Sequence, residues 1–139
     1  MLKDILAWQD FREWDRSHTF VQWIFPTNEV SKFNPDAPLL DEDTLEAFKC
    51  SETCMLNAAK AYTFAQRFLW QQFGVSWMKK ADHNHLRITR IIKFLNLVGY
   101  PLAARNIYYN VIKIARGKPE VVSDITLDFW REAAAIPEN

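Results

Sequence analysis

The clearest folding signal in the sequence lies between residues 82 and 99. Apolar residues recur there three, four, seven and ten positions after the first, at Ile88, Ile91, Ile92, Leu95 and Val98. This spacing places them on one face of an α-helix, so they are expected to form a buried stripe. Asp82–Asn84 provide a helix start signal and Gly99 a stop signal. The segment therefore predicts one amphipathic helix.

The N-terminal part of the chain predicts one helix followed by a loop. The helical pattern runs roughly from Asp10 to Phe25, and Asp10 and Glu13 have the spacing of a capping box. Pro26 ends this pattern because proline disfavours helical backbone in the residue before it. Residues 26–40 contain three prolines and are expected to form a long surface loop.

The next helical pattern starts after Asp41, a good N-cap, and continues to Phe73 with a division near Ser51. In its second piece a helical stripe is expected at Met55, Ala59, Tyr62, Ala65 or Gln66, and Leu69, with Phe68 and Phe73 beside it. Cys50 and Cys54 are four residues apart, so they are expected on one helical face as packing thiols. They lack further Cys or His partners at the spacing of a zinc site.

Two more helices are expected in the C-terminal part. One starts at Pro101 and ends near Gly117, and the last starts at Ser123 and stops before Pro137. No stretch alternates apolar and polar residues for long enough to predict a strand. The fold class predicted is all-α: one domain over residues 1–139, formed by an irregular or orthogonal bundle of five to six helices.

Composition is compatible with a packed intracellular domain. Hydrophobic residues make up 49% of the chain and aromatic residues 14%, which is enough to bury a core. No apolar run approaches the ~20 residues of a membrane span. The N-terminus carries acidic residues where a signal peptide would be apolar. We therefore expect a soluble, cytoplasmic protein.

Charge is distributed unevenly along a chain whose net charge is zero. Residues 61–118 contain ten Lys and Arg against one acidic residue. Residues 1–60 contain six Lys and Arg against eleven acidic residues, and residues 119–139 contain one Arg against five acidic residues. These segments either neutralise one another in the fold or form a basic face. Nucleic-acid binding by residues 61–118 stays open, although dedicated nucleic-acid binders usually carry a net positive charge.

The densest cluster of candidate ligand-binding groups is His83, Asn84, His85, Arg87 and Arg90. Arg87 and Arg90 are three residues apart near a helix N-terminus, which favours a carboxylate or phosphate. Alternatively, the arginines pair with the acidic first third of the chain, and Asn84 or Asp82 caps the helix. Two histidines two positions apart diverge in a helix, so no metal site is predicted.

A second candidate site is the pair Gln22 and Trp23. Trp23 either borders an aromatic pocket or anchors the core, and Gln22 needs a hydrogen-bond partner if it is buried. No catalytic or cofactor motif is recognisable, so neither an enzyme nor a cofactor is expected. An unfamiliar enzyme acting on a small anion near His83, and self-association through exposed aromatics, remain alternatives.

Two segments resemble the conserved region of the opioid growth factor receptor family. Residues 20–26 read FVQWIFP, similar to the family's IQWLFP, and residues 83–92 read HNHLRITRII, similar to HNxLRITRIL. Residues 39–49 (LLDEDTLEAFK) and Phe73-Gly74 also resemble the corresponding parts of the family's conserved region, so the resemblance covers roughly residues 10–135. It implies an all-helical domain and, in the animal receptor, binding of an enkephalin peptide and nuclear association. For this chain it implies a non-enzymatic domain with a peptide or protein partner.

Overall fold

The computed structural model describes residues 20–31, 35–70, 77–116 and 118–137. Within these ranges the chain forms six helices and no strand, which confirms the all-α prediction. The helices are α3 (Val21–Ile24), α4 (Glu42–Lys49), α5 (Glu52–Leu69), α6 (Asn84–Leu97), α7 (Pro101–Ala115) and α8 (Asp124–Ala133). None of the described helices is both long and apolar enough to cross a bilayer.

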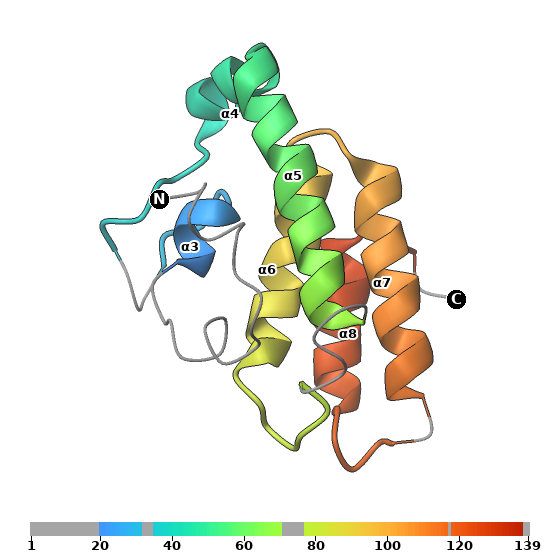
Figure 1. The fold of residues 1–139 in the computed structure, drawn as a ribbon. Helices are drawn as coiled ribbons and strands as arrows, with labels where there is room; N and C mark the ends of the chain where they lie inside the picture. The colour runs from blue at the N-terminus through green and yellow to red at the C-terminus, as the bar shows by residue number, and fades with distance from the viewer. Residues whose placement is uncertain (1–19, 32–34, 71–76, 117, 138–139) are drawn as a thin grey trace.

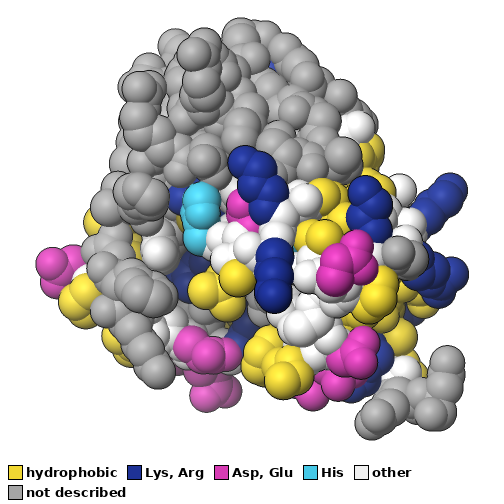
Figure 2. Space-filling view, turned by 90° about the horizontal axis from the view of Figure 1, so that it is seen from below, with side chains coloured by type: hydrophobic (Ala, Val, Ile, Leu, Met, Phe, Trp, Pro, Cys, Tyr) yellow, Lys and Arg dark blue, Asp and Glu magenta, His cyan; other side chains and the backbone are white. Residues whose placement is uncertain are grey.

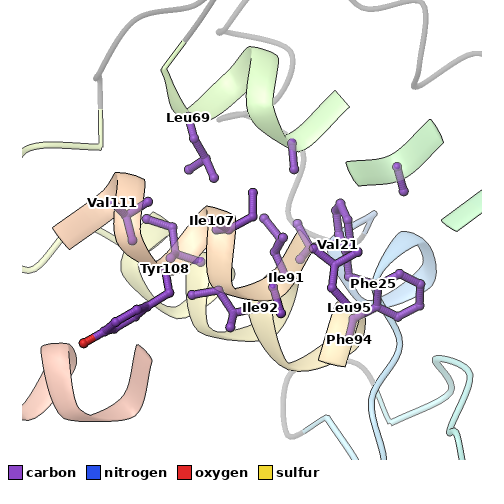
Figure 3. Packing of buried hydrophobic residues seen from close by; sticks show 14 of the residues in the cluster. Val21, Phe25, Leu69, Ile91, Ile92, Phe94, Leu95, Ile107, Tyr108 and Val111 are labelled. Carbon is purple, nitrogen blue, oxygen red and sulfur yellow. The ribbon is translucent and has the colours of Figure 1, made fainter. Parts of the chain in front are cut away.

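Helix α6 lies at the centre of the bundle (Figure 1). It packs most extensively against α7 and α8, while α5 contacts both α6 and α7. The predicted apolar stripe of α6 is fully buried at all five positions: Ile88, Ile91, Ile92, Leu95 and Val98. Figure 3 labels three of these side chains, Ile91, Ile92 and Leu95, among apolar residues of α3, α5 and α7. Burial of this stripe is the main reason that α6 forms and holds its place.

Side-chain caps fix the start of three helices where the sequence predicts them. The carboxylate of Asp41 accepts a hydrogen bond from the Thr44 amide at 2.8 Å, and starts α4. The Ser51 hydroxyl accepts from the Cys54 amide and starts α5, and the Ser123 hydroxyl accepts from the Thr126 amide and starts α8, each at 3.2 Å. The predicted division near Ser51 is confirmed, because this cap separates α4 from α5.

The structure corrects two expectations about α4 and α5. Cys50 and Cys54 do not share a helical face, because α4 ends at Lys49 and Ser51 opens a new helix between them. Both thiols are free. The buried face of α5 is also rotated from the predicted stripe, and comprises Ala58, Ala61, Phe64, Ala65, Phe68 and Leu69. Phe64 and Phe68 bury more apolar surface than the small or polar alternatives, so they determine which face turns inward.

The region before α4 is only partly described. Helix α3 has four residues and ends before Pro26, as predicted, whereas residues 10–19 with the capping-box pair Asp10 and Glu13 lie outside the described ranges. Phe73 and Gly117 lie outside them as well. The loop after α3 is closed at its base, because the Leu40 amide donates to the Thr27 carbonyl at 2.8 Å. Thr27 and Leu40 are both buried, so the ends of this surface loop are fixed to the core.

Candidate functional site

A cavity of about 650 Å³ lies between α6 on one side and α3 with the following loop on the other. We refer to it as the α3–α6 cavity. From α6 and its N-cap residue His83, it is lined mainly by residues one, three or four positions apart: His83, Leu86, Arg87, Arg90 and Lys93. This spacing follows one helical face, on the side not occupied by the buried stripe. The opposite wall contains Val21, Gln22, Thr27, Glu29 and Val30.

Aromatic contacts hold α3 against α6 and so define the cavity. Phe25 is fully buried and meets Phe94 of α6 edge-to-face, with ring centroids 5.7 Å apart. The guanidinium carbon of Arg87 lies 5.3 Å from the ring centroid of Phe20, at the start of α3. These contacts join two segments that are more than sixty residues apart in sequence, and they place Gln22 on the cavity wall.

The structure brings together four of the seven candidate residues named from the sequence. Gln22, His83, Arg87 and Arg90 all line the α3–α6 cavity. Trp23, Asn84 and His85 do not line it within the described part of the chain. The seven candidate residues therefore divide into four that line the cavity and three that have other positions in the fold.

His85 and Asn84 have structural roles. The imidazole of His85 is buried, and its Nε2 donates to the Trp77 carbonyl at 2.9 Å. Its ring meets Trp77 and Trp130 edge-to-face, and the Trp130 indole donates to the His85 carbonyl at 3.0 Å. Asn84 is fully buried, and its side-chain oxygen accepts from Nη1 of Arg87 at 3.4 Å.

The start of α6 is capped by a neighbouring side chain. The Asp82 carboxylate accepts a hydrogen bond from the Asn84 amide at 2.8 Å. The N-cap residue His83 makes no side-chain cap bond. Of the two capping residues considered from the sequence, Asp82 binds the first helical amide, while the Asn84 side chain accepts from Arg87. An acid at this position also interacts favourably with the helix dipole.

Trp23 lies away from the α3–α6 cavity. Its side chain is 44% exposed, so the interpretation as a core anchor is wrong. It borders a second, smaller cavity of about 300 Å³ together with Pro26, Phe48 and Phe94. The described lining of the α3–α6 cavity contains no Phe, Trp or Tyr side chain.

The three cations of the α3–α6 cavity have different surroundings. Arg87 is 8% exposed and contacts Phe20 and Asn84. Lys93 forms an ion pair with Glu29 from the opposite wall. Burial lowers the pKa of Arg90 and the pKa of Lys93 below their ordinary values, because a desolvated cation is less stable than a hydrated one.

In the part of the chain that the structure describes, two buried polar atoms of cavity-lining residues lack hydrogen-bond partners. Nε of Arg90 is buried and donates to no acceptor, and the side-chain oxygen of Gln22 is buried and accepts from no donor. No carboxylate of a described residue lies within ion-pairing distance of the Arg90 guanidinium. Unsatisfied buried polar groups are costly and infrequent in folded proteins. Both of these atoms belong to residues that line one cavity.

Comparison with known proteins places the chain in a family. Residues 1–76 match the model described as "Opioid growth factor receptor (OGFr) conserved region". The chain belongs to this opioid growth factor receptor family. No solved structure matches it.

The curated relatives are considerably longer than this family member. It is 29% identical over 110 residues to the opioid growth factor receptor-like protein 1 of Rattus norvegicus, covering 66% of this chain and 23% of the relative. It is 30% identical over 117 residues to the opioid growth factor receptor of the same organism, covering 71% of this chain and 20% of the relative. The corresponding receptor of Mus musculus is likewise 30% identical over 117 residues. This chain therefore spans about a fifth of the length of these relatives.

The family match and the cavity overlap only in part. Matched residues 1–76 include the α3 wall and the loop after it, while the α6 wall follows the end of the match. Sequence reasoning missed Glu29, Thr27 and Val30 because nothing local shows that this loop folds back onto α6. Lys93 could have been included among the candidate ligand-binding residues, since it follows Arg90 by three residues on the same helix. Among the described residues, no group of three or more His, Cys, Asp or Glu side chains is arranged to hold a metal ion.

Proposed function

We propose that this family member binds a peptide, or a peptide segment of a protein, in the α3–α6 cavity. The observation that carries the proposal is the convergence of Gln22, Arg87 and Arg90 on one cavity of about 650 Å³. Ligand cavities typically measure a few hundred to about 1,000 Å³ and combine apolar walls with a few polar groups. Membership of a family whose members include proteins named as receptors supports a binding role.

The lining suits the chemistry of a peptide. Val21, Val30 and Leu86 provide apolar surface for side chains. The unsatisfied donor of Arg90 and the unsatisfied acceptor of Gln22 match the carbonyl and amide groups that every peptide carries. Glu29 also lines the cavity, where its carboxylate pairs with Lys93 of the opposite wall.

The test is a fluorescence-anisotropy titration with a labelled enkephalin pentapeptide, the ligand that the family resemblance suggests. Leu86→Asp changes an exposed residue of the cavity lining, and Leu102→Asp makes the same change outside that lining. Leu86 and Leu102 are 64% and 79% exposed and both lie in the first turn of a helix, so neither change disturbs the core. This makes Leu102→Asp a matched control.

We expect saturable binding to the unmodified chain and to the Leu102→Asp variant. Binding to the Leu86→Asp variant should be roughly tenfold weaker or more, because an apolar contact worth about 1–2 kcal/mol is replaced by a hydrated charge. Equal affinity of both variants would exclude the α3–α6 cavity as the peptide site. Absence of saturable binding to any form would contradict enkephalin as a ligand of this chain.

A further inference from the structure

The charge of Arg90 is the least compensated feature of the α3–α6 cavity. Its guanidinium is partly buried, its Nε donates to no acceptor, and no carboxylate of a described residue lies within ion-pairing distance. Removing a cation from water is unfavourable unless an anion or hydrogen-bond acceptors replace the lost hydration. A neutral ligand carbonyl can accept a hydrogen bond from this guanidinium, but it brings no opposite charge.

The neighbouring cations are engaged differently. Lys93 already pairs with Glu29 across the cavity. Arg87 lies over the ring of Phe20 and donates to Asn84. Arg90 is therefore the lining cation best placed to receive an anionic group from a ligand.

We propose that the α3–α6 cavity recognises a ligand carboxylate, which pairs with the guanidinium of Arg90. This inference rests on the proposed peptide-binding function and specifies which part of the peptide is recognised. Guanidinium–carboxylate pairs are charge-assisted and can form two parallel hydrogen bonds. A peptide provides such a group as its C-terminal carboxylate or as an Asp or Glu side chain.

Gln22 provides a second element of recognition. Its unsatisfied side-chain oxygen requires an N–H or O–H donor. In a peptide, the amide N–H of the C-terminal residue is separated from the carboxylate by one Cα atom. A ligand with a carboxylate and an N–H therefore offers a partner to each of the two unsatisfied groups.

The same lining is poorly suited to phosphate. A phosphate dianion is usually held by several donors or by more than one cation. Lys93 is paired here, and the Thr89 hydroxyl donates to the His85 carbonyl of its own helix at 3.3 Å. A single available guanidinium matches the single charge of a carboxylate.

The experiment follows the ¹⁵N–¹H resonance of Arg90 Nε during titrations with small probes. N-acetylleucine carries the C-terminal carboxylate, and N-acetylleucinamide is its neutral counterpart. N-acetylaspartic acid α-amide presents a side-chain carboxylate, and inorganic phosphate tests the alternative anion. Arg90→Gln assigns the resonance, and Arg105→Gln, at an exposed position of α7 outside the described lining, is the matched control.

We expect N-acetylleucine to shift the Arg90 resonance saturably and to bind roughly tenfold more tightly than its amide. In Arg90→Gln, where this resonance is absent, the backbone amide resonances of the lining should show no saturable shift with N-acetylleucine. Arg105→Gln should retain the shift of the Arg90 resonance. A larger effect of the aspartate probe would assign the site to side-chain carboxylates, which still supports the proposal. Equal affinity for acid and amide, stronger binding of phosphate, or no shift with any carboxylate would overturn it.

These outcomes are separable from those of the peptide titration. Enkephalin that binds equally well as free acid and as C-terminal amide would support the peptide function and overturn the carboxylate inference. A carboxylate-induced shift without enkephalin binding would support the carboxylate site and contradict the enkephalin ligand. The comparison of acid with amide uses the unmodified chain, so it does not depend on the folding of a variant.

Discussion

His83 and His85 are two residues apart, but the fold gives them different roles. His83 lies at the start of α6 with 44% of its side chain exposed, and it lines the α3–α6 cavity. His85 is enclosed between two tryptophans and hydrogen-bonded to the backbone of one of them. Because a helix turns by about 200° over two residues, one histidine faces the cavity and the other faces the core.

Replacing each histidine by alanine should separate these roles. His85→Ala removes the donor to the Trp77 carbonyl and leaves space beside Trp130, so it should lower the free energy of unfolding by about 2–4 kcal/mol. His83→Ala should change it by less than about 0.5 kcal/mol, because the side chain is largely exposed. Urea unfolding followed by tryptophan fluorescence measures both values. Equal losses of stability would contradict the structural role of His85.

The candidate site was predictable where residues share a helix, but not where two segments meet. Spacing alone placed Arg87 and Arg90 near one another, and the cavity lining contains both. Their different surroundings depend on Phe20 and Asn84, and no local pattern shows these contacts. Gln22 was identified because a polar residue among apolar ones needs a partner, and its buried side-chain oxygen lacks one.

At the level of helices, α6 and α8 end in the same way but with different residues. In each, the residue after the C-cap has a positive φ: Gly99 at +96° and Ala135 at +56°. The next amide in each case bonds back to a carbonyl five residues earlier, at 2.8 Å for Tyr100 and 3.1 Å for Ile136. Glycine adopts this conformation without strain, whereas alanine does not.

Exchanging the two residue types should therefore change stability in opposite directions. Gly99→Ala should lower the free energy of unfolding by about 1–2 kcal/mol, through backbone strain alone, since no heavy atom lies within 4 Å of the added Cβ. Ala135→Gly should raise it by up to about 1 kcal/mol, reduced by the greater freedom of glycine in the unfolded chain. Thermal and urea unfolding of the two variants test this. A stabilising Gly99→Ala substitution would contradict the left-handed conformation.

Helix boundaries were more predictable from the sequence than helix faces. Caps and stop signals are local, so Asp41, Ser51, Ser123 and Gly99 marked their helix ends correctly. The face that α5 buries depends on which side chains α6 and α7 can accommodate, and such contacts connect distant parts of the chain. Periodicity therefore predicted the buried stripe of the central helix α6 but only part of the stripe of α5.

At the scale of the whole molecule, the described cations of the basic segment are spread over several elements. Lys79 and Lys80 lie in the loop before α6, Arg105 and Lys113 lie on α7, and Arg87 is buried. Figure 2 shows one face of the molecule, on which Lys and Arg side chains are interspersed with acidic and hydrophobic ones. The Lys93–Glu29 pair also joins the basic segment to the acidic first third of the chain. Neutralisation between segments thus accounts for part of the charge asymmetry in the sequence.

This distribution predicts weak binding to nucleic acid. Affinity for DNA and RNA depends on several cations that contact phosphates together, and dispersed cations with acidic neighbours release few counterions. Titration of a labelled 20-nucleotide single strand and of the corresponding duplex, followed by anisotropy, should give a Kd weaker than roughly 10⁻⁴ M at physiological salt. Raising the salt concentration should change a residual signal only slightly, because few phosphates are contacted. Micromolar binding that falls steeply with salt would instead support residues 61–118 as a nucleic-acid interface. In that case, the double variant Lys79→Gln/Lys80→Gln would test whether the loop before α6 contributes to the interface.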